Sequence, residues 1–219
     1  MKNKTGRLFI ALGCLLLAGA LCLTAYNLLT EQRADRAAQK TAAALREIIP
    51  ERSEPAAQTT ASDGGAEAAP EAGTSSSSSA SSTAEQTQTV TLDGQEYIGL
   101  LSLPALGEEL PVHSTWSYAL MQDAPCCYHG SLLTDDLVIA GHNYKKQFGA
   151  LRLLSVGDKV VFTDVDGFVY DYQIDALETL GADDVDAMIS GDWDLTLFTC
   201  TPGGVNRVAV RCRLTSGAS

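Results

Sequence analysis

Positive charge is scarce in this sequence. It holds 15 Lys and Arg residues against 27 Asp and Glu residues, a formal net charge of −12. The shortage is greatest in residues 89–219, which carry seven basic and eighteen acidic residues, whereas residues 1–30 carry three basic residues and no acidic one. A domain this acidic repels nucleic acid and anionic membrane surfaces through its long-range field. No nucleic-acid partner is therefore expected.

Large apolar residues are missing from a second segment, residues 53–88, which includes a run of serines at 75–79. A segment of this composition cannot bury enough surface to offset the entropy lost on ordering. We therefore expect a disordered stalk here. A short juxtamembrane helix that ends at Pro50 is expected before it, and residues 30–88 together form the connection to the folded domain.

Only one long hydrophobic run is present, the 22 uncharged residues of Leu8–Leu29. As a helix this run would be about 33 Å long, enough to cross a bilayer core of about 30 Å. It is longer than the apolar region of a cleaved signal peptide, about 7–15 residues, and no small-x-small cleavage site ends it. We expect an uncleaved signal-anchor: a single-pass membrane protein with residues 1–7 in the cytoplasm, 8–29 in the cell membrane and the rest extracellular, because the basic residues precede the run.

Residues 89–216 carry nearly all of the aromatic and β-branched content. Short alternating apolar runs, separated by turn signals about every ten residues, predict a β-barrel or sandwich with only small helices. The clearest hairpin joins residues 159–163 to 168–174 through Asp166-Gly167. A short helix is expected over 114–121, with Ser114 as its N-cap.

Reactive side chains stand at the ends of two apolar strands. His142 follows the predicted strand 137–140, Cys200 ends the predicted strand 195–200, and Arg207 opens the next strand. A thiol becomes a nucleophile beside a base or a positive charge, because the thiolate is the attacking species. Strand ends on one rim of a barrel can bring such groups together, although spacing in the sequence cannot show it.

These residues also carry a family resemblance. Ala140-Gly141-His142-Asn143, followed about sixty residues later by Thr196-Leu197-Phe198-Thr199-Cys200 and then by Arg207, resembles the sortases, the membrane-anchored cysteine transpeptidases of Gram-positive bacteria. The resemblance covers roughly residues 95–214, and the basic start, membrane helix and stalk match the family's layout. It implies a mainly β fold, a closed barrel of about eight strands with a few short helices, and makes residues 89–216 the catalytic domain.

The resemblance also implies roles for single residues. Cys200 would be the nucleophile, His142 the general acid and base, and Arg207 the cation that binds substrate and steadies the oxyanion, while Thr199 and Asn143 would contact the substrate. The substrate would be the LPxTG-like sorting-motif peptide of a surface protein, and the acceptor an amine of a cell-wall precursor or of a pilin. No cofactor and no metal are expected.

Other interpretations compete with this one. A sortase-fold protease or pilin polymerase is the rival among enzymes, and an inactive, membrane-anchored binding module is the rival from another class. Within the family, the short interval between Cys200 and Arg207, and the lack of a long insertion before the last strands, favour a class D-like form over class B.

Several residues are expected to be structural or solvated. Cys212 could pair with Cys126 or Cys127, or all three could be free thiols, and the sequence leaves this open. Four basic or titratable positions are interpreted as bystanders or solvated strand positions: His113, His129, Arg211 and Arg213. Three acidic residues are interpreted as the cap of a short helix rather than a calcium site: Asp183, Asp184 and Asp186.

Overall fold

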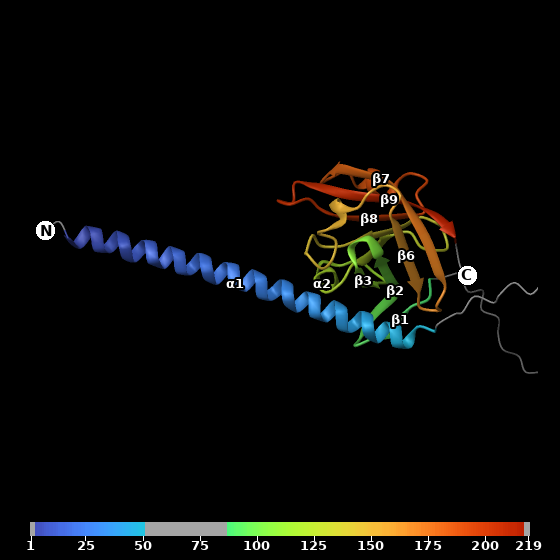
Figure 1. The fold of residues 1–219 in the computed structure, drawn as a ribbon, viewed down its shortest axis with the longest axis horizontal. Coiled ribbons are helices and arrows are strands. Elements are labelled where there is room, and N and C mark those ends of the chain that lie inside the picture. The colour runs from blue at the N-terminus through green and yellow to red at the C-terminus, as the bar shows by residue number, and fades with distance from the viewer. Residues whose placement is uncertain (1–2, 51–86, 217–219) are drawn as a thin grey trace, which may run out of the picture.

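The computed structural model describes residues 3–50 and 87–216 (Figure 1). Most of the predicted stalk, residues 51–86, lies outside the described residues. The helical elements are α1 (Asn3–Ile48), the 3₁₀ turns η1 (Pro104–Leu106) and η2 (Leu151–Leu153), α2 (Tyr118–Met121) and α3 (Val185–Ile189). The strands are β1 (Val90–Leu92), β2 (Gln95–Leu103), β3 (Glu108–His113), β4 (Cys126–His129), β5 (Leu137–Ala140), β6 (Lys159–Asp164), β7 (Val169–Gly181), β8 (Leu195–Cys200) and β9 (Asn206–Ser216).

The strands close into a barrel. Their order is β1-β2-β3-β4-β5-β8-β9-β7-β6, and a further pairing of β2 with β6 completes a ring of eight strands to which β1 adds alongside β2. The β3–β4 and β5–β8 pairs are parallel, and the others are antiparallel. Closure leaves no unpaired edge in the ring. The predicted mainly β, closed barrel is confirmed.

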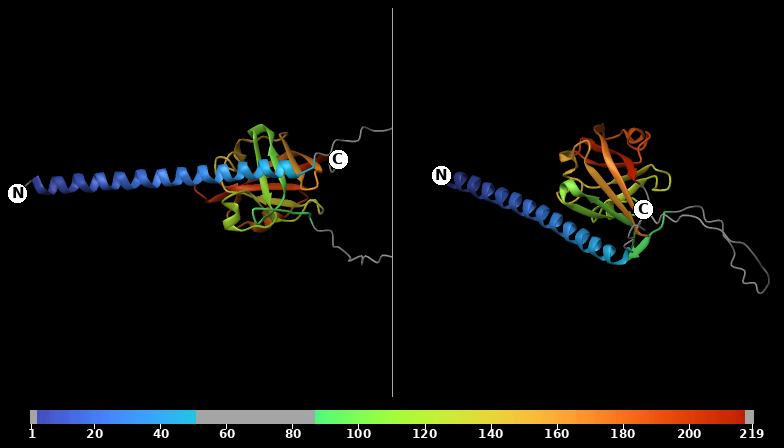
Figure 2. Two further views of the ribbon diagram at one scale, coloured as in Figure 1. Left: turned by 90° about the horizontal axis from the view of Figure 1, so that it is seen from below. Right: turned by 45° about the vertical axis from the view of Figure 1, so that its right-hand side comes forward.

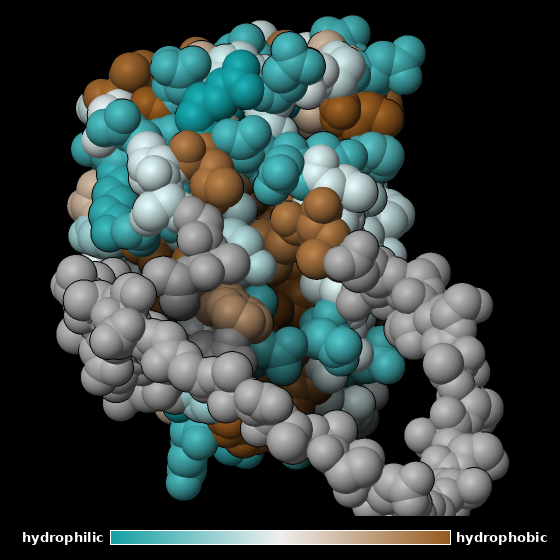
Figure 3. Space-filling view, turned by 90° about the vertical axis from the view of Figure 1, so that its right-hand side faces the viewer, coloured by the Kyte–Doolittle hydropathy of each residue, from teal (hydrophilic) through white to brown (hydrophobic). Residues whose placement is uncertain are grey.

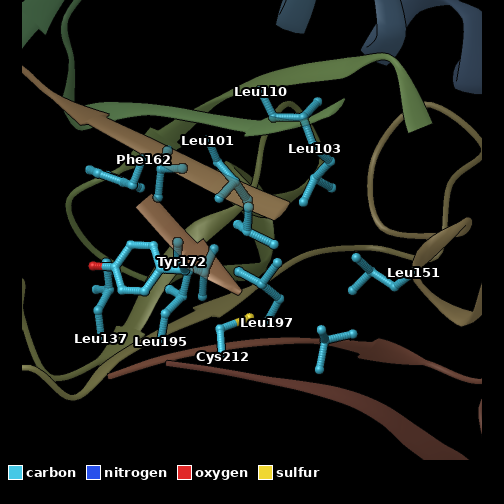
Figure 4. Close-up of a cluster of buried hydrophobic side chains, with 14 of the residues drawn as sticks. Leu101, Leu103, Leu110, Leu137, Leu151, Phe162, Tyr172, Leu195, Leu197 and Cys212 are labelled. Carbon is cyan, nitrogen blue, oxygen red and sulfur yellow. The ribbon is translucent and has the colours of Figure 1, made fainter. Parts of the chain in front are cut away.

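The barrel is filled by side chains that alternate along its strands and face inward (Figure 4). Leu195 and Leu197 of β8 face Val210 and Cys212 of β9 in this cluster, and all four are fully buried. The Cys212 thiol is unpaired, as are Cys126 and Cys127. Burial raises the pKa of Cys212 to about 12, so this thiol acts as a small apolar side chain and not as a nucleophile.

The hairpin predicted at Asp166-Gly167 is confirmed, since β6 and β7 pair antiparallel on either side of it. The Asp164 carboxylate accepts hydrogen bonds from the backbone N–H groups of Asp166 and Phe168, and Gly167 supplies a φ of +82° that other residues rarely adopt. The turn is therefore held by both its backbone and its first side chain.

The helix predicted over 114–121 is shorter, and its predicted N-cap is wrong. The helix α2 begins at Tyr118, and the Ser117 hydroxyl accepts the N–H of Leu120 as the cap. Ser114 instead donates its backbone N–H to the carbonyl of Glu96. Ser117 has the extended backbone that capping requires and stands directly before the helix.

The helix α1 runs without a break for 46 residues and lies across the outside of the barrel at its C-terminal end (Figure 2). Within the described residues, Leu8–Tyr26 is the one stretch long and apolar enough to cross a membrane. Near its other end α1 buries side chains at helical spacing: Ala38, Ala42, Leu45 and Ile49. Of these, Ala42, Leu45 and Ile49, the residue just after the helix, pack on Tyr97 and Leu100 of β2, and Arg46 forms an ion pair with Glu109.

The His113 ring is buried beneath this contact. It is 1% exposed and stacks on Tyr97, with ring centroids 4.4 Å apart. Burial lowers its pKa, because an imidazolium would lose its hydration there.

The face of the molecule that points away from the N-terminal end of α1 carries mainly hydrophilic side chains, with apolar residues in separate patches (Figure 3).

Candidate active site

The strand register brings the three predicted catalytic residues to one end of the sheet. In the parallel pair β5–β8, Ala140, the last residue of β5, lies opposite Phe198. Two residues further along each chain segment are His142, just past the end of β5, and Cys200, the last residue of β8. In the antiparallel pair β8–β9, Cys200 lies directly opposite Arg207. A base, a thiol and a cation thus lie at the same end of three neighbouring strands.

His142, Cys200 and Arg207 line one hollow of about 240 Å³. An aromatic wall extends the hollow away from Cys200. It consists of Phe198, Tyr128 and Trp116, whose rings meet edge to face at centroid distances of 5.2 Å and 5.7 Å. Such a hollow can hold an apolar peptide segment next to the thiol.

His142 is held from three sides. Its backbone N–H donates to the side-chain oxygen of Gln147 at 3.2 Å, its carbonyl accepts the N–H of Phe148, and its ring stacks on Tyr144 with centroids 4.8 Å apart. Partial burial lowers the pKa of His142 below its usual range. The imidazole is therefore mainly neutral near pH 7 and can accept a proton from a thiol.

The loop between β8 and β9 fixes Arg207. Its guanidinium donates to the carbonyls of Gly204 and Asn206, both at 3.1 Å. The loop is closed by bonds between Thr201 and Asn206, and Gly203 and Gly204 adopt positive φ angles. A guanidinium stays charged at any relevant pH, so this corner of the hollow is permanently positive.

Thr199 carries a hydroxyl without a partner. The residue is 3% exposed, and its Oγ1 makes no hydrogen bond within the part of the chain that the structure describes. It lines the hollow next to Cys200. A buried hydroxyl that lacks a partner costs free energy, and a ligand in the hollow would remove that cost.

Asn143 is exposed, and its side-chain amide donates to the carbonyl of Thr201 at 3.4 Å. It does not line the hollow that contains His142. It lines a second hollow, which also reaches Cys200 and Thr199. The predicted site residues therefore gather around Cys200 but are divided between two hollows.

The prediction that Arg211 is solvated is wrong. Arg211 is 2% exposed, and α3 covers it. Its guanidinium donates to four groups: Glu178 Oε2 at 3.0 Å, the Met188 carbonyl at 2.9 Å, Thr196 Oγ1 at 3.1 Å and the Ala187 carbonyl at 2.5 Å. Arg211 thereby fixes α3, whose Val185 and Met188 line the catalytic hollow. Arg213 is exposed as expected, and it lies over the ring of Trp193.

The predicted acidic cap of α3 is confirmed in position but wrong in its hydrogen bond. Asp184 stands at the N-cap position, but its carboxylate accepts the N–H of Gly181 and not one of the helix, and Asp186 lies in the first turn. In the described residues, no cluster of three His, Cys, Asp or Glu side chains could hold a metal ion.

Sequence reasoning missed three residues that shape the site. Trp116 lines the catalytic hollow, and an aromatic residue among the polar residues 114–117 is a sequence signal that could have identified it. Gln147 is 1% exposed and positions His142, and Arg211 fixes α3. For the last two nothing in the sequence distinguishes them from surface residues.

Comparisons with known proteins agree with this geometry. A family model described as Sortase domain matches residues 101–215, more than half of the chain. Sortase C of Streptococcus pneumoniae is 26% identical, with a TM-score of 0.50 over 56% of this chain and 70% of its own. Sortase C1 of Streptococcus agalactiae is also 26% identical, with a TM-score of 0.50 over 57% of this chain and 71% of its own.

Sortase A of Corynebacterium diphtheriae shares the fold at 23% identity and a TM-score of 0.50, over 56% of this chain and 62% of its own. No curated protein matches the chain. The family model, the closed barrel and the strand ends that carry a thiol, an imidazole and a guanidinium lead to the same conclusion: the chain belongs to the sortase family.

Proposed function

We propose that this sortase is a cysteine transpeptidase that cuts a sorting-motif peptide and transfers its acyl part to an amine. One observation carries the proposal: Cys200, His142 and Arg207 line a single hollow at the ends of three hydrogen-bonded strands. The lining joins a nucleophile, a neutral base and a fixed cation, which is the set that acyl transfer through a thioester requires.

The first half-reaction forms the acyl-enzyme. The Cys200 sulfur attacks the scissile carbonyl carbon while the thiol proton passes to His142. Negative charge develops on the carbonyl oxygen next to the Arg207 guanidinium. The C–N bond then breaks, and the departing amine takes the proton from His142.

The second half-reaction runs the same steps in reverse with a new amine. The acceptor nitrogen attacks the thioester carbonyl and gives a proton to His142. The C–S bond breaks, and Cys200 leaves as a thiolate that takes this proton back. The products are an amide and the free enzyme, so no oxidant, metal or cofactor enters the balance.

The aromatic wall would hold the apolar part of the sorting peptide. Trp116 of this wall is 40% exposed, and Tyr118, whose ring contacts Trp116 and which also lines the hollow, is 69% exposed. A peptide laid against them would bury this surface, at about 25 cal/mol per Å² of apolar area. The hydroxyl of Thr199 would gain the partner that it lacks.

We further propose that the chain is anchored by residues 8–29 with its N-terminus in the cytoplasm and residues 89–216 outside as the catalytic domain. The apolar window of α1 and the basic residues before it support this placement. The acceptor would be a cell-wall precursor or a pilin. The pneumococcal sortase C is described in terms of pilin substrate specificity, which supports testing pilins. The class D-like assignment stays a prediction.

The test is to trap the acyl-enzyme. The full chain is incubated with an LPxTG-type peptide, and intact mass is measured with and without an added amine. We expect a thioester adduct that is lost in Cys200→Ala, formed much more slowly in His142→Ala, and unchanged in the matched control His129→Ala. Amide product in the presence of amine identifies a transpeptidase, hydrolysis alone a protease, and the absence of any adduct an inactive binding module.

A further inference from the structure

A second path leads away from Cys200, outside the hollow that holds His142. Its first part, about 200 Å³, is lined by Cys200 and Thr199 together with Asn143, Phe148 and Arg152. A larger hollow of about 570 Å³ shares Asn143, Gly149 and Arg152 with it, so the two adjoin. The path therefore runs from the thiol along the residues that follow His142 and reaches the barrel surface at η1 and η2.

The path is basic, whereas the domain is acidic. Residues 89–219 carry seven basic residues against eighteen acidic ones, and three of the seven line this path: Lys145, Lys146 and Arg152. Among the described residues that line it, Glu108 is the only acidic one, and it pairs with Lys146 at 2.9 Å. The lining therefore keeps a net charge of +2, counted as three basic residues less one acidic residue.

The other four basic residues of the domain lie outside this path. Lys159 pairs with Asp171, and Arg211 is buried against Glu178. Arg213 lies over Trp193, and Arg207 belongs to the catalytic hollow. Three of the seven basic residues of the domain thus gather along one path that begins at Cys200, which borders both this path and the catalytic hollow.

We propose that this path is the acceptor groove and that it selects an amine bearing carboxylate groups. The inference rests on the proposed function. The acyl chain of the thioester occupies the aromatic hollow, so the acceptor must reach the thioester carbonyl from another side of Cys200, and the basic path opens there. Carboxylates on the acceptor are attracted to Arg152 and the two lysines.

The same charges help the chemistry. A protonated amine cannot attack a thioester, and a positive surrounding favours its neutral form because it repels the ammonium ion. The groove therefore attracts the carboxylates of the acceptor and at the same time promotes release of the proton from its nitrogen. The nitrogen then forms the amide bond, Cys200 leaves as thiolate, and the remaining proton passes to His142.

Two acceptors that differ in one charge test this directly. Triglycine and triglycinamide have the same amine and nearly the same length, but only triglycine carries a carboxylate. The full chain is acylated with a sorting peptide, and the ratio of transfer to hydrolysis is measured against acceptor concentration. Both products come from the same acyl-enzyme, so this ratio cancels any change in the acylation step.

We expect triglycine to be used at about fivefold lower concentration than triglycinamide at low salt, as for a pair of partly exposed charges. The preference should shrink as ionic strength rises. Arg152→Glu should remove or reverse it, whereas Arg213→Glu, the same change at an exposed position outside the groove, should leave it intact.

Equal use of the two acceptors by the unaltered protein, or a preference that survives Arg152→Glu, would overturn the acceptor groove while the acyl-enzyme still forms. Failure to form any acyl-enzyme is a different result. It would refute the proposed function and with it the inference built on it.

Discussion

Replacing Arg211 by lysine tests whether the buried guanidinium holds the wall of the catalytic hollow. Arg211 donates to four acceptors, two of them carbonyls of α3. A lysine keeps the positive charge but presents three donors from one nitrogen, in place of a planar fork. One ammonium cannot reach the carbonyls of Ala187 and Met188 as well as Thr196 and Glu178.

The magnitude follows from the bonds lost. A hydrogen bond with a charged partner contributes about 1.5–3 kcal/mol, and an orphaned buried acceptor adds to the cost. The loss of two of the four bonds therefore predicts a decrease of about 3–5 kcal/mol in the free energy of unfolding, a large fraction of the roughly 5–15 kcal/mol available to a domain. With an m-value of about 2 kcal/mol/M, the urea midpoint falls by about 2 M.

Arg213→Lys is the matched control, because Arg213 lies on the same strand but is exposed over Trp193. Its midpoint should move by less than about 0.5 M, since the contact of an exposed cation with an aromatic ring contributes at most about 1 kcal/mol. In Arg211→Lys the Michaelis constant for the sorting peptide should also rise, because α3 lines the hollow. A midpoint shift as small as that of the control would refute the role assigned to Arg211.

Three further predictions concern other parts of the molecule. His113→Phe should flatten the acid side of the stability profile. The folded protein holds His113 neutral with a lowered pKa, so the unfolded chain binds more protons below pH 6.5. The stability of the wild-type protein therefore falls as the pH drops from 6.5 through the folded-state pKa. Urea midpoints at several pH values check this, and equal slopes in both proteins would refute it. Leu45→Ala should cost about 2–4 kcal/mol in the docking of α1 and raise hydrogen exchange there, whereas Ile48→Ala, at a half-exposed position, should cost under about 1 kcal/mol. The rate of acyl-enzyme formation should fall in acid with a half-point below pH 6.5, since burial lowers the pKa of His142; a half-point above 6.5 would contradict its role as the base.

The barrel could be predicted because each strand carries its own signal. Alternating apolar residues mark strands such as β8 and β9, and Asp166-Gly167 marks a hairpin, so local patterns were sufficient for the fold class. The closeness of His142 and Cys200 has no local signal. It arises from the parallel pairing of β5 with β8, two strands that are more than fifty residues apart in the sequence.

Arg211 shows what alternation cannot provide. Alternation along β9 places it with Ala209 on the face opposite the core residues Val210 and Cys212, where an arginine is usually solvated. On this face, however, α3 covers the sheet, and Ala209 is as fully buried as the core. Periodicity indicates which face a residue occupies, but the element that packs on that face comes from distant parts of the chain.

The docking of α1 on the barrel determines how far the barrel lies from the apolar window of the helix. Ile49, the residue that follows α1, and Val90 at the start of β1 belong to one apolar cluster, so the end of the helix packs directly on the start of the barrel. The 12 residues from Tyr26 to Ala38 cover about 18 Å of helix between the apolar window and the first buried contact. In the eight-strand ring β8 is four strands from β2, the strand on which α1 packs. The packing of α1 on β2 therefore sets how far the barrel lies from the apolar window of the helix.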